Sequence, residues 1–151
     1  MLLQDAENYI EIEFVDRVPE GLPTAGDTEL SVKVCSYGFC GQTFAWINAN
    51  CLANFLNELT ELEKRREGVA ALKGVIGEAE FLLRVRSVDR RGHMVIEGRL
   101  TKYIYRGEAG PYHHVMEFGF EFDPTLLPKL LSEFRAIAHG RQAEEVDFKN
   151  G

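Results

Sequence analysis

The chain has 151 residues, of which 45% are hydrophobic and 27% are charged, and its formal net charge is −7. This balance is typical of a folded domain with one core, and it excludes a disordered chain. No apolar run approaches the ~20 residues that a membrane-spanning helix needs. The first residues lack the basic and apolar segments of a signal peptide, so we expect a cytoplasmic protein.

The negative charge is concentrated near the N-terminus. Residues 1–48 contain eight acidic residues but only two basic ones, Arg17 and Lys33. An acidic region repels phosphate groups, so we expect the protein to bind neither nucleic acid nor an anionic membrane. It would instead attract a basic protein and speed their encounter. Solubility alone also explains such a charge.

The three cysteines, Cys35, Cys40 and Cys51, form no C-x-x-C motif. An odd number without that spacing argues against a disulfide framework and against a zinc site. If Tyr37-Gly38 forms a two-residue turn, Cys35 and Cys40 lie opposite each other at a distance that a disulfide can span. In a reducing cytosol we expect them as thiols.

The first half of the chain alternates between apolar and polar residues in three stretches, which predicts strands at 9–16, 29–36 and 39–47. The intervening residues 17–28 contain two prolines and two glycines and predict a loop. A helix should begin at Asn48 or Asn50 and end at Gly68, because apolar residues recur there at helical spacing. Residues 69–77 form a connector, with a short strand as the alternative.

The second half repeats this pattern. Strands are predicted at 78–88, 93–105 and 112–122, followed by a helix that begins near Asp123-Pro124-Thr125 and stops at Gly140. A shift of 75 residues aligns the two helices and places Asn48 on Asp123. A decayed duplication and a generic strand-to-helix junction explain this similarity equally well.

These elements predict an α+β fold of two layers, with the order β-β-β-α-β-β-β-α over a single domain, residues 1–140, followed by a polar C-terminal tail, 141–151. The six strands should form one largely antiparallel sheet, with both amphipathic helices on one face and the other face open. The open face would carry polar residues from five of these strands: Glu11, Glu13, Lys33, Arg84, Arg86, Glu97, Arg99, Thr101, Glu117 and Glu121.

Phe44 and Trp46 share one side of their predicted strand. We expect that side to be the core, because large aromatic side chains dominate core burial. On the open face, the two rings would instead be anchors for a partner.

No pattern in the sequence predicts a catalytic residue, a metal site or a cofactor. His113 and His114 are adjacent, so they point to opposite faces of a strand and cannot ligate one metal together. The carboxylate pairs Glu11/Glu13 and Glu78/Glu80 lie at outward positions of predicted strands, where solvation is the simpler explanation. Tyr103, Tyr105 and Tyr112 surround a glycine-rich hairpin tip, where tyrosines serve as contact residues.

Several segments together resemble the WapI-type immunity proteins, small bacterial proteins associated with polymorphic toxins. These segments are Asn8-Tyr9-Ile10-Glu11-Ile12-Glu13-Phe14, Phe55-Leu56-x-Glu58-Leu59, Glu78-Ala79-Glu80 and Asp123-Pro124-x-Leu126-Leu127-Pro128-x-Leu130-Leu131. The resemblance extends over about residues 1–138. It implies a stoichiometric inhibitor that is not an enzyme, and it assigns no functional residues.

We therefore predict a non-catalytic protein that binds and neutralises a cognate basic, nuclease-like toxin domain. The predicted partner-binding residues are Glu11, Glu13, Trp46, Glu97, Arg99, Tyr103, Tyr105 and Glu117. Two alternatives stay open. One is a small-molecule-binding protein or enzyme with a pocket between sheet and helices, and the other is a homodimer joined through the open face.

Overall fold

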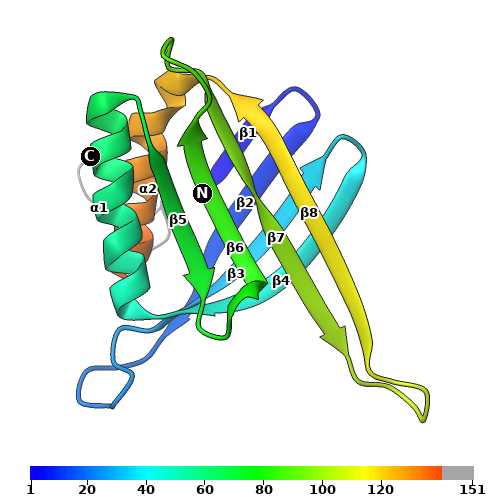
Figure 1. Cartoon of the computed structure of the whole chain (residues 1–151). Helices are drawn as coiled ribbons and strands as arrows, with labels where there is room; N and C mark the ends of the chain where they lie inside the picture. The colour runs from blue at the N-terminus through cyan, green and yellow to red at the C-terminus, as the bar shows by residue number, and fades with distance from the viewer. Residues whose placement is uncertain (141–151) are drawn as a thin grey trace, which may run out of the picture.

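The computed structural model describes residues 1–140, with Glu78 and Ala79 described by their backbone alone. Figure 1 shows the arrangement of the strands and helices. The elements are β1 (Leu2–Asp5), β2 (Asn8–Arg17), β3 (Thr28–Ser36), β4 (Phe39–Ile47), α1 (Ala49–Arg65), β5 (Val69–Gly74), β6 (Gly77–Ser87), β7 (Met94–Ile104), β8 (Tyr112–Phe122), the 3-10 turn Pro124–Leu126 and α2 (Leu127–Ala138). The predicted tail, 141–151, lies outside the described residues.

The α+β class and the antiparallel pairing are confirmed, but the prediction of one six-stranded sheet is wrong. The strands form two four-stranded sheets, which we call the N-terminal sheet (β1-β2-β3-β4) and the C-terminal sheet (β5-β6-β7-β8). The two sheets lie one behind the other in Figure 1. Each half of the chain is thus four strands followed by a helix, rather than three.

The two extra strands, β1 and β5, carry weak sequence signals. Strand β1 has only four residues, which is too short for an alternating pattern, and it ends in a turn in which Ala6 has a φ of 52°. Strand β5 lies within residues 69–77, where the sequence predicts a connector with a short strand as the alternative, and two of its six residues are alanines, which favour strands weakly. Pairing with β2 and with β6, respectively, compensates for these low propensities.

The apolar faces of both sheets and both helices share one core. Inward residues from each layer are fully buried, such as Ile12 from β2, Ile96 from β7, and Phe55 and Phe134 from the helices. The rings of Phe55 and Phe134 meet edge to face, with centroids 4.9 Å apart. Figure 1 shows the helices together along one side of the two sheets, next to β5.

This arrangement also corrects the expectation of a single open face. Because each sheet turns its apolar face inward, each has its own uncovered outer face, and the two outer faces point in opposite directions. Glu11, Glu13 and Lys33 belong to one of them. Arg84, Glu97 and their neighbours belong to the other.

A side-chain cap follows a strand directly at the start of α1 and at the start of the 3-10 turn that leads into α2. The Asn48 side chain accepts a hydrogen bond from the backbone N–H of Asn50, and Asp123 accepts one from Thr125. The 75-residue shift therefore matches two caps with the same role, and the two halves share one element order. Helix α1 ends at Arg65 and is capped by Arg66, whose φ is 58°, two residues before the predicted Gly68. Within residues 1–140, no helix is long and apolar enough to cross a membrane.

Candidate functional site: two unlike outer faces and a cleft

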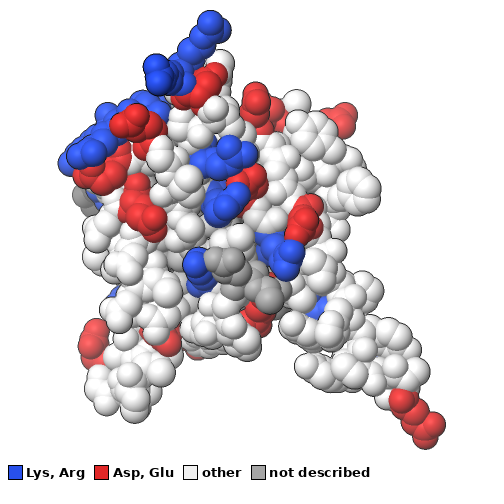
Figure 2. Space-filling view, viewed as in Figure 1, with Lys and Arg blue, Asp and Glu red and all other residues white. Residues whose placement is uncertain are grey.

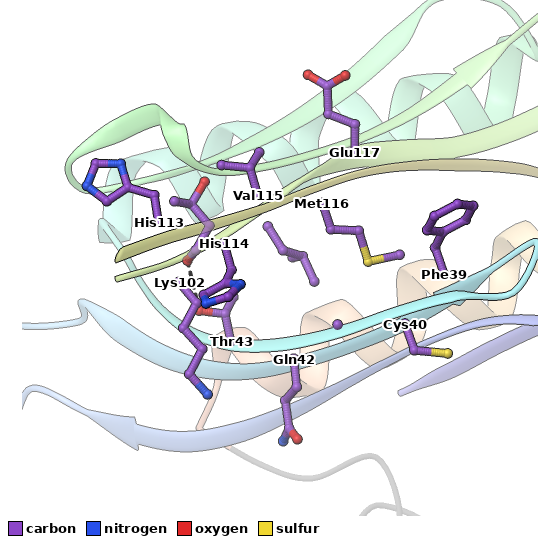
Figure 3. Close-up of a pocket in the computed structure, with 13 residues that line it drawn as sticks. Phe39, Cys40, Gln42, Thr43, Lys102, His113, His114, Val115, Met116 and Glu117 are labelled. Atoms are coloured by element: carbon purple, nitrogen blue, oxygen red, sulfur yellow. Dashed lines mark hydrogen bonds between the residues drawn. The ribbon is translucent and has the colours of Figure 1, made fainter. Parts of the chain in front are cut away.

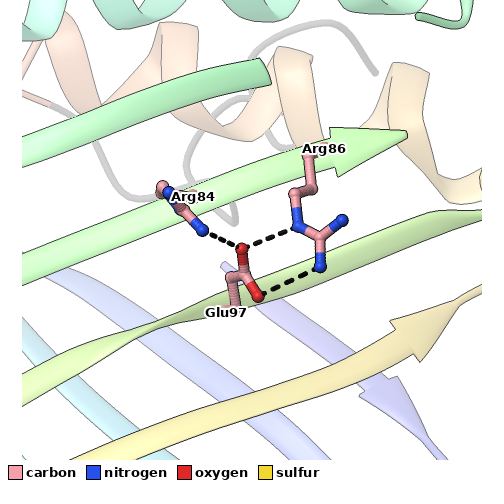
Figure 4. A network of polar contacts seen from close by, with 3 residues as sticks. All are labelled: Arg84, Arg86 and Glu97. Atoms are coloured by element: carbon pink, nitrogen blue, oxygen red, sulfur yellow. Dashed lines mark hydrogen bonds and ion pairs between the residues drawn. The ribbon is translucent and has the colours of Figure 1, made fainter. Parts of the chain in front are cut away.

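The outer face of the C-terminal sheet neutralises its own charge. Arg84 donates a hydrogen bond to Glu97 at 2.5 Å, and the Arg86 Nε donates to the same carboxylate at 2.7 Å (Figure 4). Arg99 pairs with Glu117 on the next strand. Figure 2 shows basic and acidic side chains interspersed over this face. Most of its charge is therefore already compensated within the protein.

The pKa values follow from this network. The hydrogen bond with Arg86 and, in addition, that with Arg84 lower the pKa of Glu97, against an opposing effect of burial. The same contact with Glu97 raises the pKa of Arg86. Both partners are thus held in their charged forms, as is typical of a structural ion pair.

The outer face of the N-terminal sheet is acidic and is not neutralised. The strand register places Asp16 directly opposite Glu29, and Glu13 lies in the next row opposite Ser31. Like charges directly opposite each other on a sheet are destabilising. Among residues 1–140, no basic side chain forms an ion pair with any of these three carboxylates. The nearest base on this face, Lys33, is the cross-strand partner of Glu11.

Two aromatic rings complete this acidic area. Phe44 lies opposite Ser31, and Trp46 lies opposite Glu29, with 59% and 37% of their surface exposed. The prediction that both rings are in the core is wrong. The inward positions of β4 are Thr43, Ala45 and Ile47, which fill the core with smaller side chains. We call Glu13, Asp16, Glu29, Phe44 and Trp46 the acidic–aromatic patch.

The sequence contains a signal that would have placed the two rings outside. The turn Tyr37-Gly38, in which both residues have positive φ, fixes the register of β3 and β4. Counting back from that turn pairs Phe44 with Ser31, and Ser31 faces away from the apolar positions Leu30 and Val32. Register thus determines the exposed face, although residue type favours burial. Asp16 and Glu29 were likewise not among the predicted site residues.

Residues 101–116, which we call the arm, comprise the far ends of β7 and β8 and the turn between them. The arm extends away from the body of the protein (Figure 1). Tyr103 and Tyr105 lie on it with rings stacked at 6.5 Å, and Tyr103 also meets His113 edge to face at 4.6 Å. Tyr105 is 77% exposed. The tyrosines therefore brace one face of the arm and present aromatic surface to solvent.

Thr101 does not lie on an open face, contrary to prediction. It is buried because β7 passes over β4 at this point, where the Thr43 hydroxyl donates a hydrogen bond to the Thr101 carbonyl at 3.2 Å. This contact joins the two sheets at the base of the arm.

A cleft of about 690 Å³ lies between β4 and the arm (Figure 3). Residues 39–43 of β4 form one wall, and residues from β7 and β8, including Leu100, Lys102 and Met116, form the other. In Figure 3, Met116 and His114 are directed toward β4, whereas His113, Val115 and Glu117 point away. The cleft combines an apolar floor with polar groups at its mouth. It lies away from the helices, unlike the pocket expected between sheet and helices.

Two of the four histidines contact other side chains of the protein. His113 contacts Tyr103, while His93 bonds to Asp89 at 2.5 Å in the turn after β6, and this bond lowers the pKa of Asp89. The structure, over the residues it describes, contains no group of three or more His, Cys, Asp or Glu side chains that could hold a metal ion.

Cys35 and Cys40 are joined in a disulfide, where thiols were expected. They are directly opposite on β3 and β4, with Cα atoms 4.1 Å apart, as the predicted two-residue turn requires. The Tyr9 hydroxyl on β2 donates to the Cys35 sulfur at 3.3 Å. Cys51 is a free, partly buried thiol on α1.

The structure distributes the eight predicted partner-binding residues over three separate places. Glu11, Glu13 and Trp46 share the outer face of the N-terminal sheet. Glu97, Arg99 and Glu117 lie on the opposite face of the protein, within the neutralising network. Tyr103 and Tyr105 lie on the arm. One flat interface cannot contain all three groups.

Comparison with known proteins identifies the family of this chain. The model of the immunity protein WapI-like family matches residues 1–140, which include every described strand and helix. No curated protein and no solved structure matches the chain. The chain therefore belongs to the immunity protein WapI-like family.

Proposed function

We propose that this protein binds and neutralises a cognate basic, nuclease-like toxin domain, and that it does so without catalysis. Family membership supports a toxin-neutralising binding protein in general. The basic character of the partner is supported by one observation above all. No basic side chain of residues 1–140 forms an ion pair with the three carboxylates of the acidic–aromatic patch, and the two aromatic rings of the patch are exposed.

This patch has the composition of a protein-binding surface. Aromatic side chains are enriched at the centres of interfaces, where they dominate affinity. Carboxylates around them favour a partner with a complementary basic surface and raise the rate of association. Enzymes that act on nucleic acids carry such basic surfaces, because they must hold the phosphate backbone.

The proposed contact surface is the N-terminal sheet, with Glu11, Glu13 and Trp46 from the predicted set and Asp16, Glu29 and Phe44 in addition. The C-terminal sheet is a weaker candidate, because a partner would have to compete with ion pairs that are already formed. The tyrosines of the arm stay in the proposal as peripheral contacts, since the arm extends beyond the body of the protein.

The test is a binding measurement with the purified product of the adjacent gene, as the candidate toxin domain. We expect a one-to-one complex by calorimetry at low salt, and an association rate that falls as salt is added, because salt screens charges beyond ~10 Å at moderate ionic strength. Co-expression should also protect cells from the toxin domain. No complex at micromolar concentrations and low salt would contradict the proposal.

Two charge reversals with the same change in net charge provide the control. Glu13→Lys alters the patch, whereas Glu121→Lys alters the outer face of the C-terminal sheet. We expect Glu13→Lys to slow association by ~10-fold at low salt, and Glu121→Lys to slow it far less. Equal effects would indicate that only the overall charge of the protein matters.

A further inference from the structure

Strand β4 is an unprotected sheet edge. Its nine residues, Phe39–Ile47, include neither a charged residue nor a proline. Native proteins normally protect an exposed edge with charges, prolines, short strands or a covering element. The other edge strands of the two sheets have such protection: β1 has only four residues, β5 contacts α1 and carries Lys73, and β8 carries Glu117 and Glu121.

The free backbone groups of this edge can be assigned from the register. A two-residue hairpin closes on a hydrogen-bonded pair, here Ser36 and Phe39, and bonding then alternates along the strand. The N–H and C=O groups of Cys40, Gln42 and Phe44 consequently face away from β3. Within residues 1–140, no other strand bonds to them, and the Phe44 carbonyl accepts a long hydrogen bond of 3.4 Å from the Thr43 hydroxyl of β4 itself. Backbone contact on this side resumes only at Trp46, whose carbonyl accepts a bond from the Val75 N–H at 2.9 Å.

The cleft lies along this same stretch of β4. Residues 39–43 line it, facing Met116 and Leu100 of the opposite wall (Figure 3). Gly41 lacks a side chain where Met116 of the arm packs against β4, since a Cβ there would lie 3.0 Å from the Met116 sulfur. The free edge is therefore flanked by apolar surface on its cleft side, and by Gln42 and Phe44 on its outer side.

We propose that the edge of β4, from Phe39 to Phe44, is a strand-addition site for an extended segment of the partner in which apolar and basic residues alternate. This inference rests on the proposed function, because it describes how that partner is held. Main-chain hydrogen bonds to Cys40, Gln42 and Phe44 would supply affinity, and pockets for alternate side chains would supply specificity.

The alternation follows from strand geometry. Successive side chains of an added strand point to opposite faces of the sheet. Those on the cleft side meet Leu100 and Met116, which suit apolar residues. The side chains on the outer side lie next to Phe44, whose ring face attracts a guanidinium or ammonium group. The carboxylate of Glu13 lies in the same row of the sheet, on the far side of Ser31. A second copy fits less well, because pairing β4 with β4 would align two acidic faces in one continuous sheet.

The experiment compares Gln42→Pro with Gln42→Ala in binding to the toxin domain. Proline removes the outward N–H and places its ring on the edge, but it leaves the bonds to β3 intact, as edge strands tolerate. We expect Gln42→Pro to weaken the complex by at least ~10-fold and Gln42→Ala by less than ~2-fold, with both variants melting near the wild-type temperature.

Amide hydrogen exchange on the wild-type protein gives an independent measurement, which holds even if Gln42→Pro fails to fold. In the complex, the amides of Cys40, Gln42 and Phe44 should exchange at least ~10-fold more slowly than in the free protein. A wild-type complex without this protection overturns the inference and leaves the proposed function intact. Protection of the same amides in a homodimer, seen by light scattering without toxin, also overturns it. Failure of the wild-type protein to bind refutes the proposed function instead.

Discussion

Replacing Phe44 by alanine tests whether the exposed rings of the N-terminal sheet are binding anchors. A phenylalanine has ~200 Å² of accessible surface, so the 59% that is exposed corresponds to ~120 Å². At ~25 cal/mol per Å², complete coverage of this area by a partner is worth ~3 kcal/mol, or a ~150-fold change in the dissociation constant. The fold itself should lose less than ~1 kcal/mol, because most of the ring is already in water.

The assay is calorimetry or surface-based kinetics with the toxin domain, together with a thermal melt of each free variant. Most of the loss should appear as faster dissociation, since buried apolar contacts affect mainly the off-rate. Val88→Ala is the control. Val88 is also exposed, but it lies in the turn that follows strand β6 of the C-terminal sheet. A change of less than ~2-fold for Phe44→Ala, in a complex that the wild-type protein does form, would refute the reasoning.

Three further predictions concern stability and are measured by urea unfolding. Gly98→Ala should cost more than ~3 kcal/mol, because its Cβ would lie 2.0 Å from the Leu82 carbonyl oxygen, whereas Gly119→Ala should cost less, since its nearest contact is 3.3 Å. Arginine partners lower the pKa of Glu97, so the free energy of unfolding of the wild-type protein should exceed that of Glu97→Gln by up to ~1 kcal/mol at neutral pH. This difference should vanish as the pH falls through that lowered pKa. Burial raises the pKa of Glu133, so Glu133→Gln should be the more stable form at neutral pH, and this advantage should disappear in acid. The opposite pH responses of the two glutamine variants check the assigned signs.

Local patterns predicted most of the individual elements. Strand β2 alternates Ile10 and Ile12 with glutamates, and both isoleucines are completely buried. The apolar stripe of α1, which includes Phe55 and Leu59, faces the core as expected. These signals are reliable because burial of one face is a property of a single element, and the sequence of that element is enough to show it.

The division into two sheets could not be predicted in the same way. A strand pattern shows which face is buried, but it does not show which edges form hydrogen bonds with each other. One backbone hydrogen bond, from Val75 to Trp46, joins the ends of β4 and β5 in the described residues. The edges of β4 and β5 otherwise diverge, and α1 separates these two strands in the sequence. The number of sheets thus depends on how the sheets and helices pack together over long distances in the sequence.

The candidate site was only partly predictable for a related reason. The sequence indicates the acidic N-terminal region and the outward position of two of its glutamates, Glu11 and Glu13. Residue type alone assigns Phe44 and Trp46 to the core, although Ala45 and Ile47 of the same strand are the residues that are buried there. The cleft depends on the path of the arm across β4, which no local pattern specifies.

The charges of the two outer faces should have different effects. Those of the C-terminal sheet should affect mainly stability, and those of the N-terminal sheet should affect mainly binding. Glu97 and its arginines compensate one another, so substitutions there should lower stability with little effect on a partner. Asp16 and Glu29 face each other, and no basic side chain of the described residues forms an ion pair with them, so their charges should cost stability in the free protein. A basic partner would remove that cost by supplying the missing cations, and part of the binding energy would come from this relief. Replacing Glu29 by glutamine should therefore stabilise the free protein slightly while weakening its complex. A loss of both stability and binding would show that the acidic pair is a structural feature of the sheet.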